Sequence, residues 1–173
     1  ISLESIKGSI WNTSTSRENT NLNDIVIGSF ENVGEIKAGN NISIAAADTV
    51  RNTGAVIEAN EDIGVVSNNI VLDTIQINNS VNKEKYQKET KENVGGSVSG
   101  NNIILVADNN IEIKGSDLES TNSITMLGNE INIESVENYS YEKNGSGKNY
   151  TIKEKVNNIG SAVTGENISI SAD

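Results

Sequence analysis

The sequence predicts an all-β fold: a right-handed parallel β-helix, or solenoid, with coils of about 20 residues and projecting β-hairpin insertions. Three observations predict it: a long internal repeat, a short strand-like period within that repeat, and segments that interrupt the period. Residues 32–72 align without a gap with residues 93–133 at an offset of 61, with 13 identities in 41 positions. Residues 93–108 recur at 158–173 with 8 identities in 16. A constant long period is typical of repeat proteins.

The short period predicts the coils. Triplets of the Ile-x-Ile type begin at Ile42, Ile63, Ile103 and Ile124, and equivalent triplets in successive coils are 20 or 21 residues apart. Alternation with period two marks short strands with one buried face. A chain that returns every 20 or so residues, with two or three short strands per circuit, forms coils of a parallel β-helix. The main rival, a β-sandwich, does not account for one period nested in another.

The composition fits a stack of hydrogen-bonded strands around an aliphatic core. The 173 residues include no proline, which cannot donate to a strand ladder, and only 3% aromatic residues. We therefore expect Ile, Val, Leu and Ala to fill the core. The absence of cysteine excludes disulfides and thiolate metal sites. A net charge of −11 argues against nucleic acid as a partner.

We expect no transmembrane helix, because no stretch approaches the roughly 20 apolar residues that one requires. Ile1 falls inside a repeat, so we expect any targeting signal to lie outside this chain.

Three segments depart from the coil pattern, and we expect them to project from one face of the stack as insertions. They are residues 6–31, 75–92 and 136–157. The chain, one β-helix segment over residues 1–173, is thereby divided into the end of a truncated repeat with its insertion, two repeats, and the start of a further repeat. These parts are residues 1–31, 32–92, 93–157 and 158–173.

The third insertion has the pattern of a hairpin. Tyr139, Tyr141 and Lys143 alternate along one arm, and Lys148, Tyr150 and Ile152 along the other, around an Asn-Gly-Ser-Gly turn at 144–147. We expect segment 6–31 to pair in the same manner, with Ile10–Trp11 against Ile25–Ile27.

The insertions hold most of the aromatic and basic residues, which makes them candidates for surface contact. Eight of the thirteen basic residues fall in 83–91 and 143–155. On one interpretation, the long Lys and Glu side chains only solvate a protruding ribbon and protect its edges. On the other, Tyr and Lys contact an anionic or sugar-bearing surface. The candidate contact residues are Trp11, Tyr86, Tyr139, Tyr141, Tyr150, Lys143 and Lys148.

The acidic residues do not indicate catalysis or metal binding. Asp48, Asp108 and Asp173 occur once per repeat, at turns, whereas an acid–base pair needs two carboxylates at one site. The G-G-x-G-x-D repeat of calcium-loaded β-rolls is also missing. We therefore expect no catalytic residue, no metal and no cofactor. The equivalent residues Asn41, Asn102 and Asn167 are expected to form hydrogen-bonded ladders along the stack.

One motif connects the three repeats to a known family. The pattern G-x-x-x-x-G-[NE]-N-I-x-I-x-A-D occurs at 34–48 with one extra Ala, at 95–108 and at 160–173. With this motif and the Asn-Val-Gly-Gly-Ser-Val segment at 93–98, the chain resembles the haemagglutinin repeat region of the filamentous haemagglutinin family. Residues 32–36 depart from the Gly-Gly-Ser pattern.

The resemblance implies a structural and adhesive stalk segment of a large, secreted, cell-surface exoprotein of a Gram-negative bacterium. It also implies export by an outer-membrane transporter of two-partner secretion, through regions outside this chain, and contact with a host or neighbouring cell. In contact-dependent growth-inhibition exoproteins, this region is implied in passing a toxin across the target outer membrane. A specific glycan- or protein-binding module is the alternative function, and a polysaccharide-active enzyme is disfavoured. Exposed strand edges at the ends of the stack predict end-to-end self-association.

Overall fold

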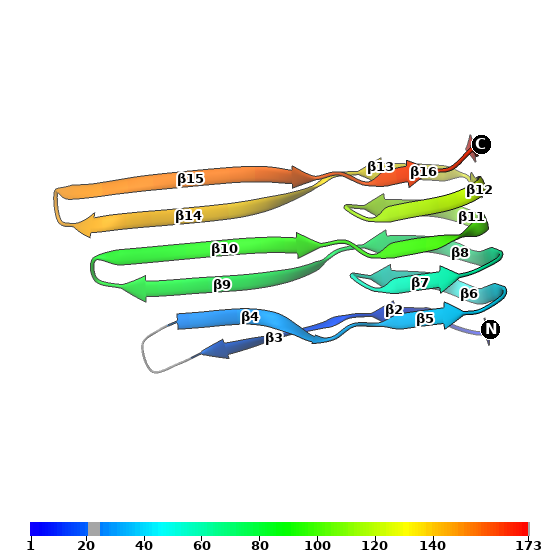
Figure 1. The fold of residues 1–173 in the computed structure, drawn as a ribbon, viewed down its shortest axis with the longest axis horizontal. Helices are drawn as coiled ribbons and strands as arrows, with labels where there is room; N and C mark the ends of the chain where they lie inside the picture. The colour runs from blue at the N-terminus through cyan, green and yellow to red at the C-terminus, as the bar shows by residue number, and fades with distance from the viewer. Residues whose placement is uncertain (21–24, 173) are drawn as a thin grey trace.

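The computed structural model describes residues 1–20 and 25–172, and these form an all-β structure with two sheets (Figure 1). One sheet has eleven strands and the other six. The all-β prediction is therefore confirmed. Each sheet contains strands from the start to the end of the described chain, and both sheets extend along the same axis (Figure 1).

The eleven-stranded sheet, here called the coil stack, consists of parallel strands that return to the same place in each coil. Ile42 lies opposite Ile63, and Ile103 lies opposite Ile124, which confirms that these residues occupy adjacent coils. The strands of the coil stack are β1 (Ser2–Ser5), β2 (Ile10–Thr13), β5 (Glu35–Ala38), β6 (Ile42–Thr53), β7 (Val56–Ala59), β8 (Ile63–Asp73), β11 (Ser97–Lys114), β12 (Asp117–Gly128), β13 (Glu130–Glu134), β16 (Ala162–Thr164) and β17 (Asn167–Ala172).

A complete coil has three faces, formed in the second coil by residues 56–59, 63–67 and 70–73 in this order, and each face contributes one to three inward columns to the core. Alternation along each strand places every second side chain inside. Ile42, Ile63, Ile103 and Ile124 form one such column, and each is at most 1% exposed. The core cluster consists of Ile, Val, Leu and Ala side chains together with Met126, which confirms the aliphatic core.

Glycine allows the chain to turn from the third face of one coil to the first face of the next. Gly54 and Gly115 are equivalent residues with φ of 53° and 51°. This left-handed conformation is costly for residues that have a Cβ. A Cβ on Gly54 would also overlap the side chain of Ile75, which comes directly after the next coil in the chain.

Polar ladders run along the corners of the coil stack. The amide of Asn102 donates to Asp62 Oδ1 at 2.7 Å, and its oxygen accepts from Asn122 Nδ2 at 2.8 Å. Asn41 Oδ1 accepts the backbone N–H of Asp62 at 3.0 Å. The predicted ladder is therefore present across four coils, from Asn41 to Asn122, and includes Asp62; the part predicted for Asn167 stays a prediction.

Replacing Asn52 with alanine is expected to destabilise the coil stack. Asn52 is fully buried, accepts a 2.8 Å hydrogen bond from Asn12 Nδ2 and donates a 2.7 Å bond to the Ala55 carbonyl. Removing the amide leaves buried polar groups unpaired, so we expect a loss of about 1–3 kcal/mol in urea denaturation. Asn132→Ala is the control, since Asn132 bonds Glu130 at the surface. Equal stability of the two variants would contradict the prediction.

The six-stranded sheet, here called the hairpin sheet, is built from the three insertions. Each insertion is an antiparallel hairpin that leaves the coil stack after the third face. The hairpins also pair with one another: β9 pairs with β4, and β10 with β14. Its strands are β3 (Thr15–Thr20), β4 (Ile25–Asn32), β9 (Ile75–Lys83), β10 (Tyr86–Val94), β14 (Val136–Ser146) and β15 (Asn149–Ile159).

The continuity of the hairpin sheet follows from a match of two spacings. Between the hairpins β9–β10 and β14–β15 the chain completes two coils, which advance the stack by about 9.6 Å at about 4.8 Å per coil. A two-stranded hairpin has the same width, at the same spacing between strands. Each hairpin therefore arrives beside the previous one (Figure 1), and the six strands form one hydrogen-bonded sheet.

Two predictions are wrong, one about the first insertion and one about the repeat alignment. Ile10 and Trp11 do not pair with 25–27, because they lie in β2, which is parallel to β6 with Trp11 opposite Arg51. The partner of β4 is β3. The ungapped alignment also fails on the first face, where Ile36 shares its column with Ile57 and Val98, one position later than the alignment indicates.

Candidate functional site

Three of the predicted contact tyrosines share one face of the hairpin sheet, here called the tyrosine face. Directly opposite residues in an antiparallel ladder point to the same side. Tyr141 lies opposite Glu89, and Tyr139 opposite Lys91. On the next strand, Tyr150 lies opposite Gly145, and Lys143 Nζ lies 5.1 Å from the Tyr150 ring centroid. This cation–π contact stays near the surface, where such contacts are weak.

Apolar side chains lie beside these tyrosines. Ile152 and Val156 are opposite Lys143 and Tyr139 on β15, and both are about half exposed. Burial raises the pKa of the Tyr139 phenol, with smaller contributions from Glu154 and Glu89.

The other predicted contact residues lie elsewhere. Tyr86 is opposite Lys83 and Asn144, which places it on the opposite side of the hairpin sheet. Lys148 lies in the two-residue turn between β14 and β15, whereas the sequence predicted a turn at 144–147. Trp11 lies on the coil stack, 72% exposed, outside the insertion to which the sequence assigned it.

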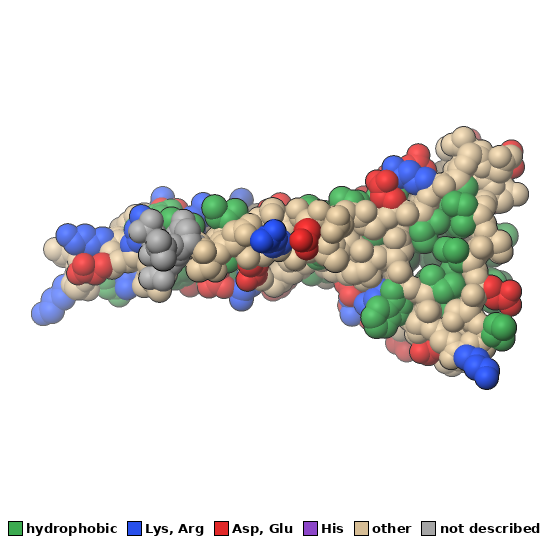
Figure 2. All heavy atoms as spheres, turned by 90° about the horizontal axis from the view of Figure 1, so that it is seen from below, with side chains coloured by type: hydrophobic (Ala, Val, Ile, Leu, Met, Phe, Trp, Pro, Cys, Tyr) green, Lys and Arg blue, Asp and Glu red, His purple; other side chains and the backbone are tan. Residues whose placement is uncertain are grey.

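The side that carries Tyr86 is richer in cations and is here called the lysine face. Its positions follow from the ladder, in which Lys88 is opposite Glu142 and Val81, and Glu142 is opposite Lys153. The sheet is a single layer that projects from the wider coil stack, with charged side chains along it and at its far end (Figure 2). The cations of the lysine face are Arg17, Lys83, Lys88, Lys153 and Lys155, and its acids are Glu92 and Glu142.

A depression that involves the predicted contact residue Tyr141 lies on the tyrosine face over β9, with a volume of about 510 Å³. It is here called the β9 groove. Its floor carries the short side chains of Asn78, Ser80 and Asn82, and Val26 and Tyr141 lie on its two sides. Sequence reasoning missed this groove, because it depends on hairpins from different repeats that pair side by side.

Polar contacts order the β9 groove. Asn78 Nδ2 donates to Glu18 Oε1 at 2.9 Å, and Gln87 Nε2 donates to Asn82 Oδ1 at 3.1 Å. Lys91 Nζ lies 3.2 Å from Glu89 Oε1, and both side chains are about half exposed. Such exposed ion pairs add little stability, but they balance the local charge.

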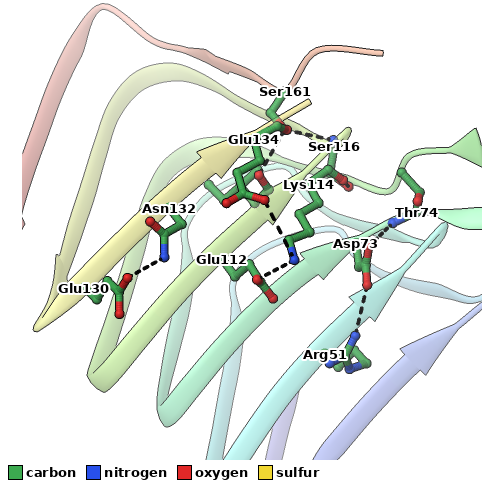
Figure 3. A network of polar contacts seen from close by, with 11 residues as sticks. Arg51, Asp73, Thr74, Glu112, Lys114, Ser116, Glu130, Asn132, Glu134 and Ser161 are labelled. Atoms are coloured by element: carbon green, nitrogen blue, oxygen red, sulfur yellow. Dashed lines mark hydrogen bonds and ion pairs between the residues drawn. The ribbon is translucent and has the colours of Figure 1, made fainter. Parts of the chain in front are cut away.

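The acidic residues of the third coil face form ion pairs within a strand and between coils (Figure 3). Lys114 Nζ lies 2.6 Å from Glu112 Oε1 and 3.9 Å from Glu134 Oε2. The Glu112 hydrogen bond is the main cause that raises the pKa of Lys114. Arg51 pairs with Asp73 at 3.2 Å across the preceding pair of coils. These charges are paired, so this surface acts as a brace between coils.

Of the aspartates that the sequence placed at turns, Asp48 and Asp108 lie within β6 and β11. Asp48 Oδ2 accepts a hydrogen bond from Ser9 Oγ at 3.1 Å, and Asp173 lies outside the described residues. Within 1–20 and 25–172, no three His, Cys, Asp or Glu side chains are grouped as a metal site would require. In the same ranges no helix is long and apolar enough to cross a membrane.

The comparison with protein families agrees with this architecture. The model of the hemagglutinin repeat family matches residues 75–173, more than half of the chain. This segment contains the hairpins β9–β10 and β14–β15 and the coils between and after them. No curated relative and no solved structure matches the chain. The chain therefore belongs to the hemagglutinin repeat family.

Proposed function

We propose that this chain is a stalk segment whose coil stack acts as a semi-rigid rod and whose hairpin sheet makes adhesive contacts with a cell surface. The family match indicates an adhesin-type exoprotein that is secreted or displayed at the cell surface. The observation that carries the proposal is the pairing of successive hairpins into one sheet. That pairing makes a broad surface that projects from the rod and extends with each repeat.

The architecture supports a mechanical role. Each coil packs its aliphatic columns only against its neighbours, so the stack lengthens by addition. The hairpin sheet adds a second set of hydrogen bonds between repeats, with six cross-strand positions between β10 and β14 alone. Two hydrogen-bonded sheets that extend along the same axis resist bending more than one sheet does.

The finer assignments rest on the family resemblance and on general rules. We propose that the coils wind in the right-handed sense, as nearly all parallel β crossovers do. We propose further that the full protein is exported across a Gram-negative outer membrane by a two-partner transporter, and that the stalk contacts a target cell during toxin delivery. The division into repeats at 32–92 and 93–157 is part of the same proposal.

A shortened hairpin tests the adhesive role. Deleting residues 140–155 and joining 139 to 156 through an Asn-Gly turn keeps the coil stack and the base of the hairpin. Beads that carry the 173-residue chain are expected to bind bacterial cells or erythrocytes, and beads with the shortened variant are expected to lose most of this binding. Circular dichroism checks that the variant keeps its strands.

Two results would contradict this role. If beads with the unaltered chain bind neither cell type, the segment makes no cell contact by itself. If the shortened variant binds as well as the unaltered chain, the contact is made by the coil stack, where Trp11 is the exposed aromatic residue.

A specific binding module is the second candidate function, and the β9 groove favours it. Hemagglutinin repeats are typically structural or adhesive. The paired acids of the third coil face do not form the converging carboxylates of a polysaccharide-active enzyme. Enzymatic activity therefore stays disfavoured.

A further inference from the structure

We propose that the β9 groove is a binding site for a short, uncharged oligosaccharide. This inference rests on the proposed adhesive role of the hairpin sheet and names the ligand class and the residues that would recognise it. The groove lies where the hairpin β9–β10 meets the hairpin β3–β4, in the lower half of the hairpin sheet in Figure 1. Its volume of about 510 Å³ falls in the range typical of small-ligand sites.

The groove exists because three features coincide along one strip of the sheet. The β9 side chains on the tyrosine face are short and polar. On β4, Gly28 contributes no side chain, and a Cβ there would overlap the carbonyl oxygen of Asn78. Glu18 lies opposite Gly28 on β3, and its carboxylate reaches Asn78 on β9 to hydrogen-bond its amide. A strip without bulky side chains is therefore bordered by larger ones.

The groove is specific to one repeat. The strand that corresponds to β9 in the next hairpin is β14, which carries Tyr139, Tyr141 and Lys143 on the same face. These side chains fill the space that is open over β9. A depression that occurred in every repeat would result from the packing of the fold. This one depends on the side chains of one hairpin.

The groups that line the groove match the chemistry of a sugar. Asn78, Asn82 and Gln87 provide amides, and Ser80 provides a hydroxyl, so the floor can donate and accept hydrogen bonds. A sugar presents hydroxyl groups at its ring edge and C–H groups on its ring faces. Tyr141 supplies an apolar ring with a polar end at the side of the groove.

The charges near the groove favour an uncharged ligand. Glu18 and Glu89 face Lys91, which is already paired with Glu89. An anionic ligand would approach two carboxylates, and its more favourable site is the lysine face on the other side of the sheet. A smaller depression of about 250 Å³ on that side is lined by Ile25, Ile27 and Lys88.

An extended peptide fits the groove less well. Peptides that bind sheets commonly add a strand to a free edge. The floor strand β9 is hydrogen-bonded to β10 over its whole length and to β4 near its outer end. Its backbone is therefore paired along the whole groove on the β10 side and at Ser80 and Val81 on the β4 side, so β9 has no free edge along the middle of the groove and recognition falls to the side chains.

Filling the groove tests the proposal. Ser80→Trp places a large side chain in the middle of the floor, at a half-buried strand position, and aromatic residues have a high strand propensity. The probe is an immobilised panel of oligosaccharides with neutral, sialylated and sulfated members. We expect the unaltered chain to bind neutral members, and Ser80→Trp and Tyr141→Ala each to bind them about tenfold more weakly or worse.

Thr90→Trp is the matched control, because Thr90 lies opposite Asn79 and Ser140 on the lysine face, beside the smaller depression. It is expected to bind neutral oligosaccharides within about twofold of the unaltered chain, a difference of a few tenths of a kcal/mol. Circular dichroism and thermal melting establish that the three variants are folded. Tyr141→Ala removes a side chain without adding bulk, so its effect on oligosaccharide binding tests the groove even where Ser80→Trp lowers stability.

Several outcomes would overturn the proposal. These are the absence of any neutral oligosaccharide that binds, undiminished binding by folded Ser80→Trp, or binding confined to sulfated members that salt abolishes. Undiminished binding by Ser80→Trp together with loss of cell adhesion in the shortened hairpin would reject the groove and leave the adhesive role standing. Loss of neutral-oligosaccharide binding in Ser80→Trp without any cell adhesion would support the groove and reject the adhesive role.

Discussion

Ile103→Ala is expected to lower the free energy of unfolding of this chain by about 2–5 kcal/mol, the range for large-to-small changes in a packed core. Ile103 is fully buried in the middle coil and lies opposite both Ile63 and Ile124. Its side chain is therefore enclosed along the axis as well as from the sides. The backbone ladder fixes the distance to both neighbours, so the stack cannot collapse into the cavity.

Urea denaturation followed by far-ultraviolet circular dichroism measures this effect. The matched control is Ile104→Ala, one residue along the same strand, where the side chain points outward and is 47% exposed. We expect the control to change stability by less than about 1 kcal/mol. A control that loses as much stability as Ile103→Ala would contradict the inward and outward assignment of β11. The two free energies of unfolding can be compared only if the slope of the free energy against urea concentration is the same in both variants.

Gly95→Ala is expected to cost about 3 kcal/mol, the upper part of the usual range for overpacking. Gly95 lies where the second hairpin returns to the coil stack, and a Cβ there would overlap the carbonyl oxygen of Gly115 in the next coil. Because the obstacle is backbone, rotation of a side chain does not relieve it. Gly96 is similarly confined by Asn52 and by the Ala55 carbonyl. The Gly-Gly pair of the repeat motif is thus explained by close backbone approach.

Thermal melting compares Gly95→Ala with Gly64→Ala. Gly64 lies in β8, and a Cβ on it would meet nothing within 4 Å. Alanine there reduces the freedom of the unfolded chain without adding strain, so the melting temperature is expected to stay the same or rise slightly. If both variants melt at the same temperature, the close approach at Gly95 does not limit the fold.

The coil stack could be predicted from the sequence because its physics is local and repeated. Each Ile-x-Ile triplet specifies a strand with one buried side, and the constant return distance specifies which triplets are neighbours. The columns through Ile42 and Ile103 follow from these two facts. The Asn102 ladder also follows, because equivalent residues in stacked coils lie close together.

The hairpin sheet could be predicted only in part. Alternating residues predicted the hairpin at 136–157, and its strands are Val136–Ser146 and Asn149–Ile159. The pairing of β10 with β14 depends on the axial advance of the coils, which no local pattern records. Trp11 was misplaced for a related reason, since a short polar segment after a coil strand looks like the start of an insertion. The single-residue shift at Ile36 is hidden by the identities on both sides of it.

The candidate site was the least predictable part. The tyrosines of β14 and β15 were identified by residue type, but their separation from the lysine face requires the strand register. The β9 groove requires, in addition, the absence of a side chain at Gly28 and the contribution of Glu18 from another insertion. A groove formed by small residues of distant segments leaves no motif in a single sequence.

Two coils advance the coil stack by the width of one hairpin, and this match restricts how the protein can change in length during evolution. An extra coil inserted alone would separate adjacent hairpins by the width of one missing strand, and a lost coil would force two strands into one position. Either event interrupts hydrogen bonding in the hairpin sheet while it leaves the coil stack intact. Gene duplications that preserve both sheets must therefore add coils in even numbers, so the evolutionary unit is the pair of coils with its hairpin.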